Sequence, residues 1–216
     1  MNVWSRPEAP RRPALSREAI VAAAIAIADA EGLAAVSIRR VAAELGARAM
    51  SLYTYIERKE DLFDLMADQV SAEVLVDEPL PAGWREALLA IARKELEAVT
   101  RHPWRVDLVA QRVNVGPNGL RHLEQSLAAL DGLEIDRTVA LRILAAVDDY
   151  VLGHIVRTSP RMGVAGGDRQ PHLPDLLATG EFPRLSEAMK AEPDAAGFEQ
   201  GLGWLLDGIE TGLGAR

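Results

Sequence analysis

Residues 37–59 read SIRRVAAELGARAMSLYTYIERK, and this stretch decides the fold. Between Ser37 and Gly46, apolar side chains recur at three- and four-residue spacing, which predicts a short helix with one buried face. Ser37 is a favoured cap for the start of that helix, and Gly46 suits the left-handed residue that ends it. A second helix, running to Ile56, follows within roughly three residues, and two short helices so closely joined form a helix-turn-helix.

Three sequence blocks resemble the DNA-binding part of the tetracycline-repressor (TetR) family of bacterial transcription regulators. They are LAAVSIRRVAAELG at 33–46, SLYTYI at 51–56 and KEDLFDLM at 59–66. The closing segment FEQGLGWLLDGIE at 198–210 resembles the end of the family's ligand domain. The resemblance implies a homodimer that binds double-stranded operator DNA and a small-molecule effector, whose identity the sequence leaves open. Our hypothesis is repression from a palindromic operator, relieved when the effector binds.

The whole chain is predicted to be all-α, in three parts. We expect a flexible N-terminal arm at 1–15, a DNA-binding domain at 16–62 and a larger ligand-binding and dimerisation domain at 63–216. The arm is rich in Pro and Arg, so it is either a disordered tail or a basic segment that touches DNA. Helical periodicity continues along the chain without a credible strand. The expected helices are 16–31, one from 59, 84–100, one ending near 113, 120–130, 136–158 and 194–213, with a loop at 159–180.

The start of the second motif helix is expected to enter the major groove, so its residues should read base edges and its flanks should bind phosphate. Arg39 matches a DNA-contacting position of the family by resemblance, and Arg48 offers a guanidinium fork that suits guanine. Met50 stands where many relatives have Pro. The alternatives are solvated surface charges for the cations and a core aromatic for Tyr53. The expected DNA contacts are Ser37, Arg39, Arg48, Ala49, Met50, Ser51, Tyr53, Thr54, Tyr55 and Lys59.

The net charge of −8 argues at first against a nucleic-acid partner, but its distribution does not. Residues 1–62 hold nine basic and eight acidic side chains, whereas residues 63–216 hold 15 basic and 24 acidic ones. The acidic excess therefore belongs to the larger C-terminal part. Because phosphate binding needs only a local basic face, the sequence permits DNA binding at the N-terminal end.

Two C-terminal helices are candidates for a dimer interface. The helix at 136–158 is apolar around most of its circumference, and the last helix carries glycines seven residues apart that favour close approach of another helix. By resemblance the same two helices dimerise, forming a four-helix bundle across a two-fold axis. The alternative is that both helices are internal to a monomer. The expected interface residues are Ile143, Val147, Val151, Gly201, Leu205, Gly208 and Ile209.

The effector is expected to bind between helices of the C-terminal part. Asp148 and Tyr150 interrupt an otherwise apolar helix, and a buried carboxylate needs a partner such as a cationic ligand, Arg or Tyr. The apolar candidates share helical spacing, and a plain core position is the alternative for each of them. The expected ligand-binding residues are Trp104, Leu108, Arg112, Leu123, Leu127, Asp148 and Tyr150.

Metal, tetracycline and enzyme chemistry are not supported by the residues present. The resemblance places Leu75 and Val109 where histidines of the founding member hold magnesium-tetracycline, and Glu95 where an aromatic residue contacts the drug. We therefore expect neither a bound metal nor a cofactor. The motifs of serine hydrolases, zinc proteases and phosphate-binding loops are missing, so no enzyme is predicted. The alternative function is an all-α ligand-binding or interaction module that does not bind DNA.

The sequence also bounds the cellular compartment. It contains no cysteine, which excludes disulfides and thiolate metal sites. Its N-terminal residues lack the apolar core of a secretion signal, and no apolar run reaches the roughly 18 residues of a membrane span. We therefore expect a cytoplasmic protein without a membrane partner.

Overall fold

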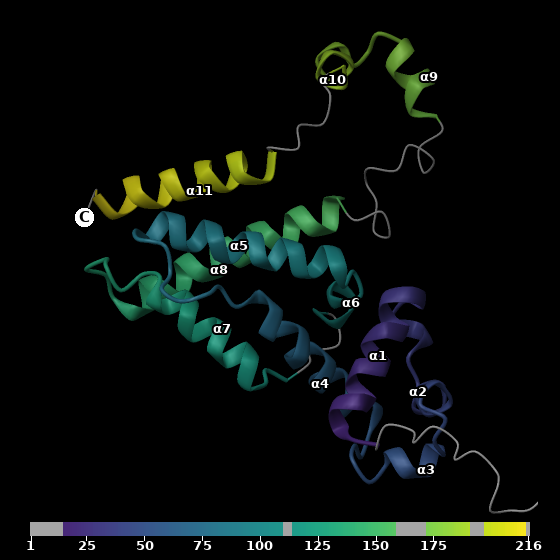
Figure 1. The fold of residues 1–216 in the computed structure, drawn as a ribbon. Coiled ribbons are helices and arrows are strands. Elements are labelled where there is room, and N and C mark those ends of the chain that lie inside the picture. Colours follow the sequence, from purple (N-terminus) through teal and green to yellow (C-terminus); the bar gives the residue numbers. More distant parts are fainter. Residues whose placement is uncertain (1–14, 110–113, 159–171, 191–196, 215–216) are drawn as a thin grey trace, which may run out of the picture.

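The computed structural model describes residues 15–109, 114–158, 172–190 and 197–214. These residues form α-helices and short 3-10 turns and contain no strand, which confirms the all-α prediction (Figure 1). None of the helices in these ranges has both the length and the apolar composition that a bilayer span requires. The helices separate into a small group at the N-terminal end and a larger group packed beyond it (Figure 1).

The N-terminal group begins with α1 (Arg17–Glu31) and continues through the 3-10 turn η2 (Leu33–Ala35) to α2 (Ile38–Glu44). Ser37 caps α2, because its hydroxyl oxygen accepts a hydrogen bond from the Arg40 amide at 3.2 Å. Gly46 follows with φ of +60°, a left-handed conformation that glycine adopts without strain. The predicted first helix, cap and glycine turn of the motif are therefore confirmed.

The second motif helix is shorter than the sequence predicts. The regular helix α3 covers Ala49–Leu52, whereas the apolar spacing favours a helix continuing to Ile56. Beyond α3 the chain continues as a turn in which the Tyr55 and Ile56 amides both donate to the Leu52 carbonyl, at 2.9 and 3.1 Å. The helical apolar pattern persists through this turn because Leu52 and Ile56 are both buried.

The next helix, α4 (Lys59–Ser71), connects the two groups and has an unusual start. Its cap residue, Arg58, is not one of the short polar residues that usually fill this position. Asp61, in the first turn, takes over the function: its side chain accepts from the amides of Arg58 and Glu57 at 2.8 and 3.2 Å. The turn η3 (Ala72–Val74) follows directly.

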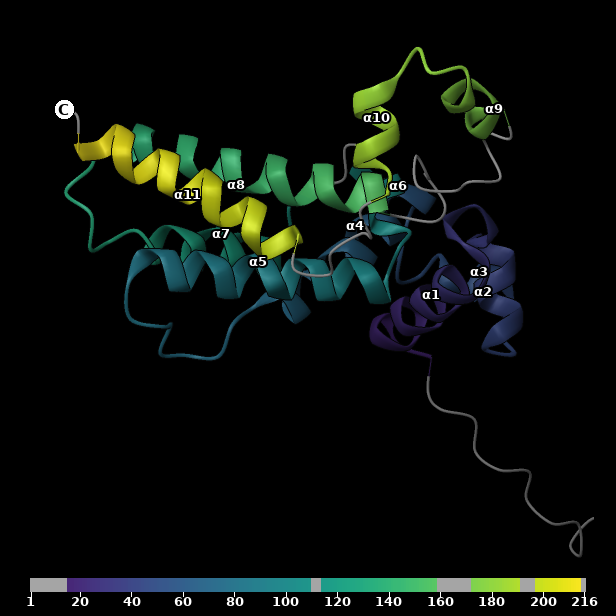
Figure 2. The same cartoon turned by 90° about the horizontal axis from the view of Figure 1, so that it is seen from above.

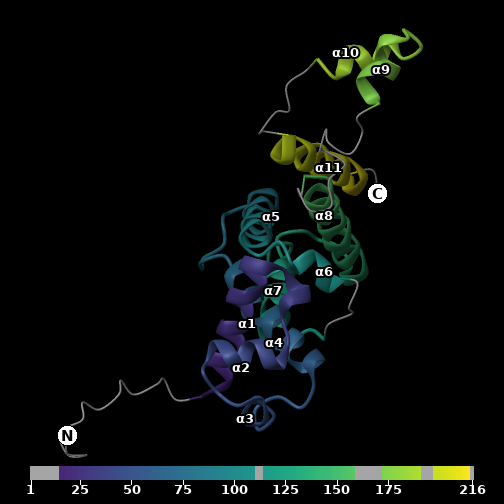
Figure 3. The same cartoon turned by 90° about the vertical axis from the view of Figure 1, so that its right-hand side faces the viewer.

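The larger group consists of five helices that pack together and two that do not. The packed helices are α5 (Trp84–Arg101), α6 (Arg105–Val109), α7 (Pro117–Ala128), α8 (Arg137–Thr158) and α11 (Gly197–Gly214). Helices α8 and α11 run side by side, with α5 against both (Figure 2). The short helices α9 (Leu173–Ala178) and α10 (Pro183–Ala188) stand away from this body, beyond α11 (Figures 1 and 3).

Several expected boundaries differ from the observed ones. Part of the loop expected at 159–180 is helical, since α9 lies within it; residues 159–171 are outside the described ranges. The last helix begins at Gly197 among the described residues, three positions after the expected start. The helix expected to end near 113 is described as far as Val109.

Buried side chains form two separate clusters. One holds the cores of α1, α2, α3 and α4, and the other lies among α5, α7, α8 and α11. Trp104 and Leu108, at the α5–α6 corner, belong to the first cluster although they follow α5 in sequence. The corner therefore packs into the DNA-binding end. The domain boundary expected at residue 62 falls inside α4, whose apolar face contributes to the same first cluster.

Candidate DNA-binding surface and effector cavity

The arginines of the motif fall into two classes. Arg39 and Arg48 are exposed and have no ion-pair partner among the described residues. Arg40 differs, because its guanidinium lies 2.8 Å from Glu31 and 2.7 Å from Glu44. Arg39 and Arg48 are therefore free to bind phosphate or a base edge, while Arg40 joins α1 to α2.

Helix α3 presents two large apolar side chains to solvent. Met50 is 75% exposed and Tyr53, just after the helix, is 47% exposed. Leu52, between them, is fully buried and fixes the helix on the core. The Ala49 and Ser51 side chains are half-buried beside them. This arrangement projects Met50 and Tyr53 outward, where they are available for contact with a groove.

Two of the expected DNA contacts also have a structural task. The Tyr55 hydroxyl donates to the Leu15 carbonyl at 2.7 Å, so its proton is not free for a phosphate. The Ser37 side chain is engaged with the Arg40 amide as a helix cap. Both side chains are half-buried, and both fix the geometry of the motif rather than its outer surface.

Thr54 and Lys59 lie at the edge of the same surface. The Thr54 hydroxyl donates to the Ser51 carbonyl at 2.7 Å, which leaves its oxygen free to accept. The Lys59 ammonium nitrogen lies 4.9 Å from the centre of the Phe63 ring, a cation–π contact that holds the charge at the start of α4. Lys59 makes no ion pair within the described ranges, so its charge is available to phosphate.

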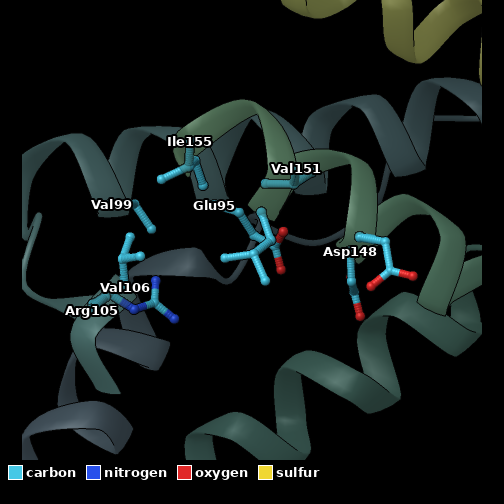
Figure 4. A pocket seen from close by; sticks show the side chains of 9 residues that line it. Glu95, Val99, Arg105, Val106, Asp148, Val151 and Ile155 are labelled. Carbon is cyan, nitrogen blue, oxygen red and sulfur yellow. The ribbon is translucent and has the colours of Figure 1, made fainter. Parts of the chain in front are cut away.

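The second candidate site is a cavity of about 240 Å³ between α5, α6 and α8 (Figure 4). A further cavity of about 320 Å³ shares Val99, Val106 and Ile155 with it, so the two adjoin. The wall combines aliphatic side chains with charged ones, a mixture that can hold an apolar ligand body and orient its polar groups. The lining residues are Glu95, Val99, Arg105, Val106, Asp148, Asp149, Val151, Leu152 and Ile155.

Charged groups from three helices converge on this cavity. The Arg105 guanidinium extends from α6 toward its middle, and the carboxylates of Glu95 and Asp148 lie across from it (Figure 4). The Glu95 carboxylate lies 2.8 Å from Nε2 of His122 on α7. Nη1 of Arg105 and Nδ1 of His122 are buried and make no hydrogen bond within the described part of the chain.

Two pKa values at the cavity are displaced from their ordinary ranges. The pKa of Asp148 is raised to about 6, chiefly because protein atoms displace water around it and also because Glu95 is negative; His122 opposes this shift. The Asp148 side chain is nevertheless exposed, so solvent screens part of this effect. Burial lowers the pKa of Arg105, against the charges of Glu95 and Glu73.

The α5–α6 corner joins the cavity to the DNA-binding end. One Asp29 oxygen, on α1, lies 2.6 Å from Nε1 of Trp104 and 2.7 Å from Nδ1 of His102. The other imidazole nitrogen lies 3.3 Å from Glu73. Trp104 is fully buried and immediately precedes Arg105. The residue that enters the cavity is thus adjacent to the residue that holds α1.

Two family models match the chain. The model described as "Tetracyclin repressor-like, C-terminal domain" matches residues 78–213, and "Bacterial regulatory proteins, tetR family" matches residues 20–66. This chain belongs to the TetR family. It is therefore a DNA-binding transcription regulator, which confirms the resemblance seen in the motif.

Individual relatives agree with this assignment along nearly the whole chain. The HTH-type transcriptional repressor DrrR1 of Streptomyces coeruleorubidus is 34% identical over 98% of this chain and 83% of its own length. Apo ActR from Streptomyces coelicolor has 30% identity and a TM-score of 0.78, covering 94% of this chain and 98% of its own. ActR in complex with actinorhodin has 29% identity and a TM-score of 0.77, covering 92% and 97%.

In this TetR-family regulator, the residues expected to bind the effector lie in different places. Asp148 lines the cavity between α5, α6 and α8, whereas Leu108 lines another cavity against α4. Trp104 is buried in the core with α1, which removes it from the cavity wall. Leu123 is 41% exposed, and Leu127 packs at the edge of the second core. Arg112 lies outside the described residues.

Tyr150 also has a different place from the one expected. Its hydroxyl donates to the Phe198 carbonyl at 2.8 Å, and the centres of the two rings are 5.7 Å apart. Tyr150 therefore stabilises the packing of α8 against α11. A Cβ added at Gly201 would collide with the Tyr150 hydroxyl. The glycine is therefore explained by a contact within one chain. A Cβ at Gly208 would meet nothing, so that position stays open.

The expected dimer residues of α8 need correction. Ile143, Val147 and Val151 are each at most 5% exposed and pack inside the second core of a single chain. They face α5 and α11 because the apolar circumference of α8 is used within the protomer. Leu205 and Ile209 of α11 are half-buried against the same core.

Sequence reasoning missed Arg105 and His122 as polar groups of the site. A signal existed for Glu95, which the resemblance had placed at a drug-contacting position. Arg105 lies between the apolar residues Trp104 and Val106, and this pattern predicts a packed helix and not a polar site. No group of three or more His, Asp or Glu side chains in the described ranges has an arrangement that would hold a metal ion.

Proposed function

We propose that this chain is a homodimeric repressor that leaves a palindromic operator when a small organic molecule enters the cavity between α5, α6 and α8. The observation that carries the proposal is the α5–α6 corner, which lines the cavity with Arg105 and holds α1 with Trp104. In this proposal, residues 16–62 bind DNA and residues 63–216 bind the effector and the second subunit. The protein acts in the cytoplasm by binding and not by catalysis.

DNA binding is supported by the outer surface of the motif. Arg48, Met50 and Tyr53 project from the segment that would lie in the major groove, and Arg39 flanks it. Lys59 supplies a further charge at the groove edge. One such segment reads few base pairs, so a two-fold pair with recognition helices about 34–36 Å apart is needed to span one turn of B-DNA.

The outer face of α8 and α11 supports a dimer. Leu141 on α8 is 49% exposed and Trp204 on α11 is 68% exposed, which is costly for a face left in water. On α11, Gly208 and Gly212 have open space where a Cβ would point. Large apolar side chains beside open glycine positions suit close helix packing against a second copy.

Effector binding is expected to act on DNA through α6. A ligand in the cavity contacts the first turn of α6 at Arg105 and Val106. A shift of this helix moves Trp104, whose indole is hydrogen-bonded to Asp29 of α1. A ligand that prefers the shifted arrangement changes the spacing of the two motifs and thereby lowers operator affinity. The crystal structures of ActR with actinorhodin and with (S)-DNPA are precedents for ligand binding in a related chain.

The test combines DNA binding and mass. Duplexes from the region upstream of the protein's own gene are titrated at several salt concentrations, and light scattering gives the mass of the protein. We expect a dimer that shifts one duplex with strong salt sensitivity. A small-molecule screen by thermal shift then identifies compounds that raise the melting temperature and release that duplex. A dimer that ignores all upstream duplexes but binds small molecules would instead identify a ligand-binding module.

A further inference from the structure

Arg105 carries a charge whose hydrogen-bond donors are not all satisfied by the described residues. Its Nη1 atom is buried and makes no hydrogen bond to any described residue. An unpaired buried donor is costly, and a charged one more so, which makes such groups rare in folded proteins. The guanidinium extends toward the cavity between α5, α6 and α8 (Figure 4), and Arg105 also lines the neighbouring cavity against α4.

The nearby carboxylates do not satisfy this guanidinium. Glu95 and Glu73 lie close enough to influence its charge, but neither accepts a hydrogen bond from it in the described structure. Glu95 is paired with His122 at 2.8 Å, and Glu73 is engaged by Arg101 in an ion pair. Both carboxylates are therefore committed elsewhere, and Arg105 keeps free donors at the cavity.

We propose that Arg105 anchors an oxyanion of the effector, most favourably a carboxylate, while the aliphatic side chains of the cavity hold the apolar part of the ligand. This inference rests on the proposed function and specifies the ligand class of its site. A guanidinium binds a carboxylate through two parallel hydrogen bonds, and a small rotation of the side chain brings Nη1 into such a pair. The ligand body would contact Val99, Val106, Val151 and Ile155.

The acidic side of the cavity sets the orientation of the ligand. Asp148 and Asp149 lie on α8, across the cavity from α6. An anionic group placed beside these carboxylates would be repelled, so it is directed to the Arg105 side. A cationic ligand is the competing class, because it would bind at Asp148 and leave the Arg105 donors unsatisfied. The buried, unpaired state of Arg105 favours the anion.

The test uses three probes that share a naphthylmethyl group and differ in charge: 2-naphthylacetate, 2-naphthylacetamide and 2-naphthylmethylammonium. Calorimetric titrations into the full-length protein without DNA give the three affinities. We expect the acid to bind on the order of tenfold more tightly than the amide, the ratio of a charge-assisted to a neutral hydrogen bond. In Arg105→Met the acid and the amide should bind within about twofold of each other.

Arg93→Gln is the matched control, because Arg93 also lies beside the cavity helices on α5 but pairs with Glu199 of α11 and does not line the cavity. It should keep the preference for the acid. Thermal unfolding without ligand adds an independent measurement: Arg105→Met should melt no lower than the natural protein, since it removes an unpaired buried charge. A purely structural arginine would instead lower the melting temperature when replaced.

Several outcomes would overturn the assignment of Arg105. They are equal binding of acid and amide, no binding of any probe, preference for the ammonium, and an acid preference that survives Arg105→Met. Because these titrations contain no DNA, they fail independently of the regulator function. Operator release by a neutral or cationic compound would leave the proposed function standing and remove only the anion anchor.

Discussion

The motif surface and the cavity both present arginines that have no ion-pair partner among the described residues, but in opposite environments. Arg39 and Arg48 are unpaired in water, where a solvated guanidinium costs nothing. Arg105 is unpaired beneath the surface, where the lost hydration is not replaced. Arg39 and Arg48 are suited to bind a polyanion, and added salt weakens such binding. Arg105 is suited to bind a compact ligand group, and salt screens that interaction far less.

The two regions meet at Trp104, and removing this side chain should have the largest effect on the molecule. Trp104→Ala deletes a fully buried indole and its hydrogen bond to Asp29, so we expect a loss of about 3–5 kcal/mol in the free energy of unfolding. Trp104→Phe keeps a six-membered aromatic ring but loses the pyrrole part of the indole with its hydrogen bond, so we expect a smaller loss of about 1–3 kcal/mol. Urea titrations followed by circular dichroism measure both values.

The control for this pair of variants is Met189→Ala, since Met189 is 52% exposed just after α10. It should change the free energy of unfolding by no more than about 0.5 kcal/mol. If Trp104→Ala were as mild as this control, the corner would not connect the two regions, and the proposed route from cavity to DNA would fail.

The next largest effect concerns the exposed arginines. Arg39→Ala and Arg48→Ala together should weaken operator binding by roughly 100-fold at moderate salt, because each removes a charge-assisted contact to phosphate or guanine. If both contact phosphate, the slope of log affinity against log salt should fall by about 2 per subunit. Anisotropy titrations between 50 and 300 mM salt, roughly the range in which counterion release dominates, measure it.

Arg137→Ala is the matched control for these titrations. Arg137 is exposed, and it pairs with Asp131 at the start of α8, far in sequence from the motif. It should leave both the affinity and the salt slope unchanged. Equal losses in the control and in the motif variants would mean that net charge, and not the motif surface, sets DNA binding.

The fold was readable from sequence wherever local chemistry determined it. Ser37 and Gly46 mark the ends of α2 by capping and by a left-handed turn, and both rules depend on one or two residues. The cavity was not readable in the same way. Asp148 was found because a carboxylate interrupts an apolar helix, but Arg105 and Glu95 become neighbours only after α5, α6 and α8 pack.

The sequence also did not show which partner buries the apolar face of α8. The apolar circumference of α8 predicts contact on several sides but does not say which side belongs to the same chain. Packing against α5 and α11 uses Ile143 and Val147, and it leaves Leu141 outward. A period of 3.6 residues identifies an apolar face, whereas the partner of that face depends on tertiary arrangement.

The smallest expected effect concerns the charge of Asp148 at the cavity. Asp148 has a folded pKa of about 6, above its unfolded value of 3.8, so the folded state binds more protons between these values. Stability should therefore decrease as pH rises through this window. Asp148→Asn removes the ionised form and should stabilise the protein at pH 7 to 8 by on the order of 1 kcal/mol, reduced by solvent screening. Below about pH 4 the gain should vanish.

Asp136, the residue before the same helix, provides a control of opposite sign. Its carboxylate accepts from the Thr138 amide at 2.7 Å at the start of α8, and hydrogen bonds to Thr138 lower its pKa. Asp136→Ala should therefore destabilise the protein at neutral pH, and the loss should shrink as the pH falls. Urea midpoints measured from pH 4 to 8 compare the two variants directly. Parallel pH profiles would show that global charge, and not the cavity environment of Asp148, controls the response.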